Sequence, residues 1–211
     1  MTESTTRRRE ILDAAAELFA GKGVGATPIR EIADRVGVVP GALYHHFPSK
    51  QAMADELAAE YLDNLRTRYR SIDARNLDPR SRLRAIVNAS LAAAQENPHA
   101  TAVYQDELSR LRDASPHARA GDLADEIKQT WLETIEDGKR QGTFRSDLPA
   151  DVFRRLIRDS MWLSIKWHEA DDAYPTARLA EDYVSIFLDG FAVDGSGAHR
   201  ADGRGPARAA A

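Results

Sequence analysis

The chain has 211 residues and a net charge of −4, a length that suits a small module joined to a larger domain. It contains no cysteine, so disulfide frameworks, thiol nucleophiles and thiolate zinc sites are excluded. No apolar run approaches the roughly 20 residues that a membrane span requires, and we expect a soluble, cytoplasmic protein without a membrane partner.

Apolar residues recur at steps of three and four almost throughout, whereas the short alternating runs typical of strands are missing. The predicted fold class is therefore all-α, with nine helices. The first helix should span residues 6–21 and end at residues 21–23, because glycine accepts the left-handed C-cap conformation. Arg7, Arg8 and Arg9 at its start are a candidate N-terminal arm, and a solvated terminus is the alternative.

Thr27 and Pro28 open the second expected helix, as its N-cap and its first helical residue. Gly37 ends this helix, and a turn over residues 37–40 follows. Residues 41–47 form a segment too short to be a stable helix alone, so its neighbours must hold it. Ser49 then caps a long fourth helix, expected over residues 49–74.

Five further helices are expected in the second part of the chain. Asp78-Pro79 opens the first of them, and Asn97-Pro98 ends it. The other four patterns cover residues 99–113, 116–141, 150–169 and 176–192. Residues 194–211 contain mostly Gly, Ala, Arg and Ser with nothing to bury, which predicts a disordered tail.

Residues 27–47 have the organisation of a helix-turn-helix, because two short helices separated by a turn follow a bracing helix. Gly41 and Ala42 are small enough to let the second short helix approach base edges in a major groove. The first 50 residues carry seven Lys or Arg against six Asp or Glu, whereas the remainder is acidic. The pattern favours DNA binding, although short helices between turns also occur in other helical proteins.

The side chains around this second short helix divide into an inward and an outward set. Leu43 and Phe47 are four residues apart and should face inward. Tyr44, His45 and His46 are then left outside, with polar tips that can reach phosphates.

Two neighbouring residues offer further phosphate contacts. Thr27 presents a hydroxyl and amide N–H groups at a helix N-terminus, and Lys50 supplies a charge just after the short helix. For each residue taken singly, a plain helix cap or a solvated surface position is the alternative.

The stretch from Ile11 to Lys50 resembles the DNA-binding region of the TetR family of one-component regulators. The likeness includes Phe19 in the first helix, the Val36-Gly37-Val38 turn and the Leu43-Tyr44-His45-His46-Phe47 segment. It implies that residues 1–50 form an arm and a DNA-binding domain, joined through the fourth helix to a ligand-binding and dimerisation domain over residues 51–193. The resemblance implies phosphate contacts from Thr27, Arg30, Tyr44, His45 and Lys50, and contacts with base edges of double-stranded operator DNA from Val39, Pro40, Gly41 and Ala42.

A helix-turn-helix reads only a few base pairs, so useful specificity normally requires a dimer. The last two expected helices carry wide apolar faces suited to a four-helix interface with a second copy. Some of these residues must instead pack the protomer core, and the sequence does not divide them. The candidate homodimer interface consists of Phe153, Ile157, Met161, Ile165, Tyr183 and Phe187, with Leu156 and Ile186 on the same apolar faces.

The eighth helix also carries Arg158, Trp162 and Lys166 at intervals of four residues. Such a stripe could hold the phosphates of a coenzyme A thioester and stack on its purine ring. Salt bridges to Asp159 or Glu169 are the alternative explanation.

Residues 103–107 and 157–167 resemble the ligand domain of actinobacterial TetR repressors that control steroid catabolism and answer to CoA thioesters of ring degradation. The resemblance implies thioester binding by Arg158 and Trp162, although relatives tend to have Arg at the position of Lys166. The predicted function is thus a TetR-type repressor released from its operator by a small-molecule effector, with no cofactor. The candidate effector site comprises Tyr104, Trp131, Arg158, Trp162 and Lys166.

Other functions remain possible from the sequence alone. The DNA-binding module could serve a regulator whose ligand is a hydrophobic drug. Catalysis finds little support, because the histidines are scattered and neither a Gly-rich phosphate loop nor a helical zinc motif is present. A helical adaptor that binds no DNA is the remaining alternative. We therefore predict a protein that is not an enzyme and has no metal site.

Overall fold

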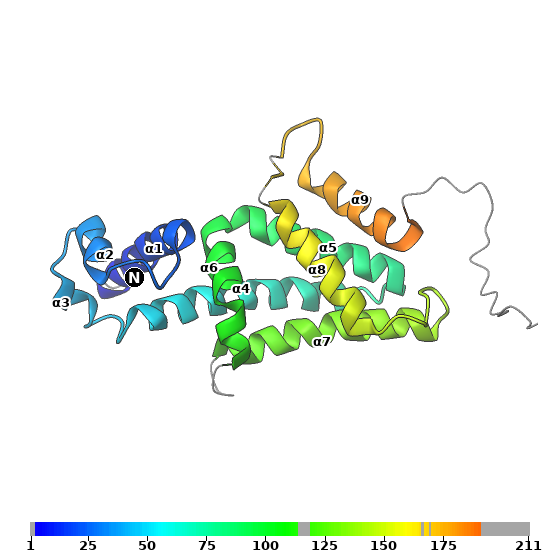
Figure 1. The fold of residues 1–211 in the computed structure, drawn as a ribbon, viewed down its shortest axis with the longest axis horizontal. Helices are drawn as coiled ribbons and strands as arrows, with labels where there is room; N and C mark the ends of the chain where they lie inside the picture. Colours follow the sequence, from blue (N-terminus) through cyan, green and yellow to red (C-terminus); the bar gives the residue numbers. More distant parts are fainter. Residues whose placement is uncertain (1–2, 114–118, 166, 169, 191–211) are drawn as a thin grey trace, which may run out of the picture.

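The computed structural model describes residues 3–113, 119–165, 167–168 and 170–190, and all regular structure within them is helical (Figure 1). The predicted all-α class and the predicted nine helices are confirmed for this part of the chain. Lys166 and the expected tail at 194–211 lie outside the described residues. The helices are α1 (Glu3–Lys22), α2 (Ile29–Val36), α3 (Pro40–Leu43), α4 (Lys50–Asp73), α5 (Pro79–Glu96), α6 (Pro98–Asp113), α7 (Arg119–Arg140), α8 (Ala150–Ile165) and α9 (Thr176–Asp189).

Several helix ends follow from the capping residues. Gly37 has φ 76° at the C-cap of α2, a left-handed conformation that favours glycine. The Ser49 hydroxyl accepts a hydrogen bond from the backbone N–H of Ala52 at 3.1 Å, as expected for the N-cap of α4. Asp78 caps α5 in the same way, accepting from the N–H groups of Arg80 and Ser81. Among the described residues, no helix is both long and apolar enough to span a membrane.

Two hydrophobic cores divide the described chain. The smaller core joins α1, α2 and α3 to the start of α4, with Phe19, Ile32, Leu43 and Phe47 at most 1% exposed. The larger core lies among the later helices and includes Leu62, Leu83 and Ile157. The long helix α4 contributes to both cores and runs from the small module into the body (Figure 1).

Helix α6 makes a second connection between the module and the body. Val103 on α6 is fully buried in the smaller core, whereas Tyr104, the next residue, packs in the larger core. The Gln51 side chain at the start of α4 also donates a hydrogen bond to Glu107 on α6 at 2.8 Å. Helix α6 therefore packs in both cores.

The chain returns from α7 to α8 through a tight turn. The backbone N–H groups of Thr143 and Phe144 both donate to the carbonyl oxygen of Gly138, at 2.8 and 3.0 Å. The ring of Phe144 packs directly against Gly138 in α7, where a Cβ atom would otherwise lie. This turn brings α8 back alongside α7.

Candidate functional site

The short helix α3 lies at one end of the molecule (Figure 1). Leu43 is fully buried and Phe47 is 1% exposed, so these two side chains fix the segment from within. Val39 is 71% exposed and Tyr44 is 55% exposed, and His45 is exposed beside them. The predicted division is confirmed for the inward Leu43 and Phe47 and the outward Tyr44 and His45, whereas His46 is half-buried. The α-helix is shorter than expected, because it ends at Leu43 and residues 44–46 form a turn.

The predicted role of Thr27 as an N-cap with an accessible hydroxyl is wrong. Pro28 occupies the N-cap of α2, and Thr27 is fully buried. Its hydroxyl donates inward to the carbonyl oxygen of Gly23 at 2.8 Å, so it closes the turn after α1. Lys50 also stabilises this turn, since its Nζ donates to the carbonyl oxygens of Gly25 at 2.7 Å and Thr27 at 3.1 Å.

The expected N-terminal arm is helical over its described part, because α1 begins at Glu3. Arg8 is ion-paired with Glu56 on α4, and its guanidinium lies 4.3 Å from the centre of the Phe47 ring. Arg9 pairs with Glu60 at 2.7 Å. These two arginines therefore fasten α1 to α4 and do not form an arm. Arg30, by contrast, remains largely exposed, with 82% of its side chain accessible and Asp34 3.8 Å away.

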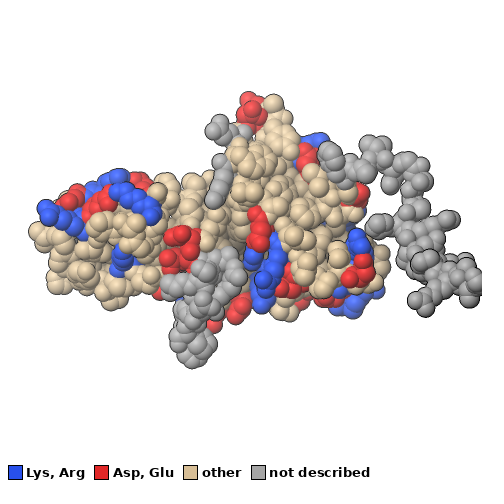
Figure 2. Space-filling view, in the orientation of Figure 1, with Lys and Arg blue, Asp and Glu red and all other residues tan. Residues whose placement is uncertain are grey.

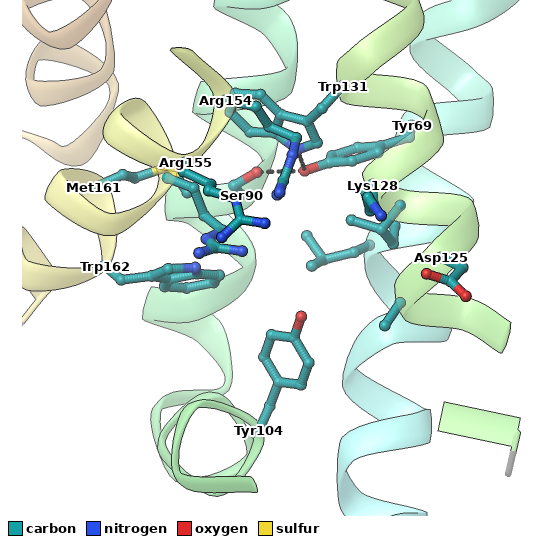
Figure 3. A pocket seen from close by; sticks show the side chains of 14 residues that line it. Tyr69, Ser90, Tyr104, Asp125, Lys128, Trp131, Arg154, Arg155, Met161 and Trp162 are labelled. Atoms are coloured by element: carbon teal, nitrogen blue, oxygen red, sulfur yellow. Dashed lines mark hydrogen bonds between the residues drawn. The ribbon is translucent and has the colours of Figure 1, made fainter. Parts of the chain in front are cut away.

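A cavity of about 130 Å³ opens among α4, α5, α6, α7 and α8 in the body (Figure 3). Four of the five residues predicted for the effector site line it together, namely Tyr104, Trp131, Arg158 and Trp162. Sequence reasoning did not anticipate the others, which come from helices far apart in the chain. These additional lining residues are Leu65, Tyr69, Ser90, Ala124, Asp125, Ile127, Lys128, Arg154, Arg155 and Met161.

A chain of hydrogen bonds closes one end of the cavity (Figure 3). The indole N–H of Trp131 donates to the Tyr69 hydroxyl at 3.0 Å, and the hydroxyls of Tyr69 and Ser90 are 2.6 Å apart. The Ser90 hydroxyl donates to the Ile86 carbonyl oxygen, so Tyr69 donates to Ser90. Burial raises the pKa of Tyr69 to about 12, which keeps this phenol protonated as a donor. This end of the cavity is therefore rigid, with its donors satisfied.

The cavity wall on α8 is cationic. Arg154 and Arg155 share the Asp151 carboxylate, with Arg154 Nη2 at 2.6 Å and Arg155 Nε at 2.7 Å from its oxygens. Their hydrogen bonds lower the pKa of Asp151 to about 2, so it remains ionised near neutral pH. Arg158 pairs with Asp159 at 2.6 Å while its side chain is only 18% exposed. The alternative of a salt bridge at Arg158 is thus correct, and this residue also lines the cavity.

An unsatisfied donor belongs to Trp162. Its indole Nε1 is buried and has no hydrogen-bond partner among the described residues. The Trp162 ring lies 6.4 Å from that of Tyr104, which lies 5.5 Å from that of Tyr61 on α4. A buried N–H without an acceptor is uncommon and costly, so this indole is suited to an acceptor atom of a ligand.

Two of the residues predicted for the dimer interface lie on the inner face of α8. Ile157 is fully buried and Met161 is 1% exposed within the protomer, so both belong to the core. Phe153 and Phe187 pack edge to face at 6.0 Å between α8 and α9. Tyr183 stacks on Phe187, and Ile165 is half-buried against the same core. Ile157 and Met161 are therefore excluded from the interface, whereas the half-buried Phe153, Ile165, Tyr183 and Phe187 stay predicted interface residues.

A different side of α8 is apolar and uncovered. Val152, Leu156 and Leu163 are 45%, 57% and 60% exposed, and their spacing puts them on one side of the helix. Trp167 just beyond α8 is 61% exposed, and Ile186 on α9 is 49% exposed. Figure 2 shows an area without Lys, Arg, Asp or Glu over α8 and the adjacent part of α9. We call these five residues the outer apolar face. Only Leu156 and Ile186 were anticipated from the sequence.

Two family models match the chain. Residues 11–57 match the bacterial regulatory proteins of the tetR family, and residues 76–191 match a tetracyclin repressor-like C-terminal domain. The second match alone spans more than half of the chain.

The chain belongs to the TetR family.

Individual relatives match this TetR-family chain over nearly its whole length. The HTH-type transcriptional repressor KstR2 of Rhodococcus jostii RHA1 is 40% identical over 186 residues, which covers 88% of this chain and 91% of the relative. KstR2 of Mycobacterium tuberculosis H37Rv is 36% identical over 190 residues, 90% of this chain and 95% of the relative. The protein is thus a TetR-type transcriptional repressor and not an enzyme, as predicted.

Solved structures agree with the fold of this TetR-family protein. The structure of the ketosteroid transcriptional regulator KstR2 of M. tuberculosis superposes with a TM-score of 0.77 at 35% identity, covering 92% of this chain and 98% of that one. The probable transcriptional regulatory protein RHA5900 superposes with a TM-score of 0.76 at 39% identity, covering 89% and 100%. TetR repressors bind operator DNA and form dimers, the two partners that the sequence predicted.

Proposed function

We propose that this TetR-family repressor binds its operator through α3 as a dimer and is released by a bulky acyl-CoA thioester. The exposed surface of Val39, Tyr44 and His45 over buried Leu43 and Phe47 supports the DNA contact. Tyr44, His45 and Arg30 would hold phosphates, whereas Val39 and the small residues of α3 would lie against base edges. Lys50 would stabilise this surface indirectly, through its hydrogen bonds to the backbone carbonyl oxygens of Gly25 and Thr27.

The operator contact predicts a large effect of two substitutions. Tyr44→Ala with His45→Ala removes two polar side chains from the outer surface while leaving Leu43 and Phe47 in place. We expect about 100-fold weaker binding to the DNA upstream of the protein's own gene, from the loss of phosphate contacts in both protomers. Electrophoretic mobility shift at moderate salt measures this change. His99→Ala, which removes an exposed histidine from α6, should leave the shift unchanged. The proposal would be contradicted if the double variant and His99→Ala lost DNA binding equally. It would also be contradicted if the wild type showed no salt-sensitive DNA binding.

The observation that best supports an anionic, partly apolar effector is the composition of the cavity wall. Four cationic side chains line it against one carboxylate, beside four aromatic residues, and the indole N–H of one of these, Trp162, is unsatisfied. Two relatives named KstR2 are described as repressors, and one as a ketosteroid transcriptional regulator. A CoA thioester from steroid or related lipid breakdown combines phosphates, an acceptor carbonyl and a bulky apolar group.

The size of the cavity supports a switch between two conformations. At about 130 Å³ it is smaller than the roughly 300–1,000 Å³ of typical ligand sites, so a bulky effector must widen it. An effector that binds the widened state more tightly shifts the population toward that state. If the widened state spaces the two α3 helices differently, binding of the effector weakens binding of the operator by the same factor.

Arg158 separates an acyl-CoA from a hydrophobic drug as the effector. Arg158→Ala should weaken binding of cyclohexanepropanoyl-CoA about 10- to 100-fold, because a charged hydrogen bond to phosphate is lost. Binding of an uncharged drug should hardly change. Quenching of tryptophan fluorescence, together with release of operator DNA, measures both. Arg145→Ala, which removes an exposed arginine paired with Asp147 outside the cavity, is the matched control; equal thioester affinity in wild type and Arg158→Ala would favour the drug alternative.

A further inference from the structure

The pocket-facing side of α7 carries two charged residues, Lys128 and Asp125, that the family resemblance does not account for. Ala124, Ile127, Lys128 and Trp131 recur at steps of three and four, and all four line the cavity. Three of them are apolar or aromatic, which suits a buried ligand. Lys128 is the one cation among these four residues, and it lines the cavity while remaining exposed.

Lys128 also differs from the other cations of the cavity in its counter-ions. Arg154 and Arg155 are held by Asp151, and Arg158 is held by Asp159. Within the described part of the chain, no ion pair involves Lys128. Its charge is therefore the one in the wall that a protein carboxylate does not already offset.

The position of Lys128 is opposite the arginines. Figure 3 shows Lys128 on α7, across the cavity from Arg155 on α8. Charges on two walls suit a ligand group that offers anionic oxygens in more than one direction. A phosphate or diphosphate does so, whereas a single carboxylate at the end of an acyl chain presents its charge to one wall only.

We propose that Lys128 is a phosphate-binding residue that holds the nucleotide part of the effector from α7, while Arg155 and Arg158 hold it from α8. This inference rests on the proposed acyl-CoA effector. Lysine acts here as a point charge that neutralises the phosphates, and the arginines supply directional hydrogen bonds. The ligand class is a thioester that retains its phosphates, and an acyl-pantetheine would not use this contact.

The second charged residue of α7 in the wall acts in the opposite sense. Asp125 lies three residues before Lys128 and is the only carboxylate among the residues that line this cavity in the described chain. Its charge repels a phosphate that approaches Lys128. Removing the charge of Asp125 should therefore strengthen binding of the same ligand.

The test compares ligands with and without phosphates on single-charge variants of the full chain. Lys128→Gln should bind cyclohexanepropanoyl-CoA about five- to tenfold more weakly at low salt, and the difference should shrink as salt is added. Lys128→Arg should restore most of the affinity, and Asp125→Asn should raise it above that of the wild type. The phosphate-free S-cyclohexanepropanoyl-pantetheine should bind Lys128→Gln and wild type equally. Calorimetry or tryptophan quenching measures each affinity.

The outcomes separate the two proposals. Arg140→Gln removes a positive charge from α7 outside the cavity and should leave thioester binding unchanged. If wild type binds the CoA thioester and Lys128→Gln binds it equally well, Lys128 has no phosphate contact and this inference is wrong. An equal loss in Lys128→Gln and Arg140→Gln would overturn it too, because a general field effect would then explain the change. If the wild type binds neither the thioester nor coenzyme A, the proposed effector itself fails.

Discussion

Leu156→Glu combined with Leu163→Glu is expected to convert the protein to a monomer and to weaken operator binding by at least about 100-fold. Both side chains are more than half exposed in the protomer, so the substitutions should leave its core and thermal stability nearly unchanged. In a symmetric dimer each leucine contributes twice, and burying one leucine side chain is worth about 1.5 to 3 kcal/mol. Burying four carboxylates in the same contact is costly as well.

Sedimentation velocity measures the mass, and mobility shift measures the operator affinity. Gln129→Glu with Gln141→Glu adds the same charge at exposed positions outside the outer apolar face, and should remain dimeric. A dimer that persists in the leucine variant would place the subunit contact elsewhere on the molecule. A monomer that still binds the operator with wild-type affinity would show that operator binding does not require two α3 helices joined in a dimer.

Gly138→Ala should destabilise the protein by about 1 to 3 kcal/mol, because overpacking a filled core forces side chains out of position. A Cβ added at Gly138 would overlap Cδ2 and Cε2 of Phe144, far closer than van der Waals contact allows. Rotation of the ring about its Cβ–Cγ bond does not relieve the overlap, since Cγ itself would lie only 2.8 Å from the added Cβ. The turn that sets α8 against α7 should therefore loosen, and the cavity between them with it.

Urea denaturation followed by circular dichroism gives the change in unfolding free energy. Gly21→Ala is the matched control, because a Cβ there meets nothing within 4 Å and alanine is the better helix former by about 0.8 to 1 kcal/mol. Its stability should stay level or rise. Combining Gly138→Ala with Phe144→Leu should cost less than the sum of the two single changes, since the smaller side chain relieves the clash. Additive losses would mean that Phe144 is not the obstacle.

The features that were predictable from the sequence are those set by nearest neighbours along the chain. Gly37 and Ser49 mark helix ends because a left-handed backbone and a hydroxyl acceptor are local requirements. The inward direction of Leu43 and Phe47 follows from helical spacing. Thr27 was misread because a threonine before Pro-Ile resembles an N-cap, whereas the chain turns one residue later and draws the hydroxyl inward to Gly23.

The division of α8 could not be predicted, because this helix is apolar on two sides and cationic on a third. Ile157 and Leu156 are adjacent in sequence and equally apolar, yet one is fully buried and the other is 57% exposed. Only the packing of α7, α5 and α9 against α8 decides which side is covered. Similarly, Tyr69, Ser90 and Trp131 come from three helices, and no local pattern indicates that their hydrogen bonds meet.

Val103 and Tyr104 are consecutive residues of one turn of α6, one packed in the smaller core and the other lining the cavity of the body. A displacement of the α6 backbone at this turn would therefore reach both the N-terminal module and the cavity. Substitutions that reshape the cavity around Tyr104 should consequently change the strength of repression in the absence of an inducer, whereas substitutions of Lys128 and Asp125 on α7 should leave it nearly unchanged.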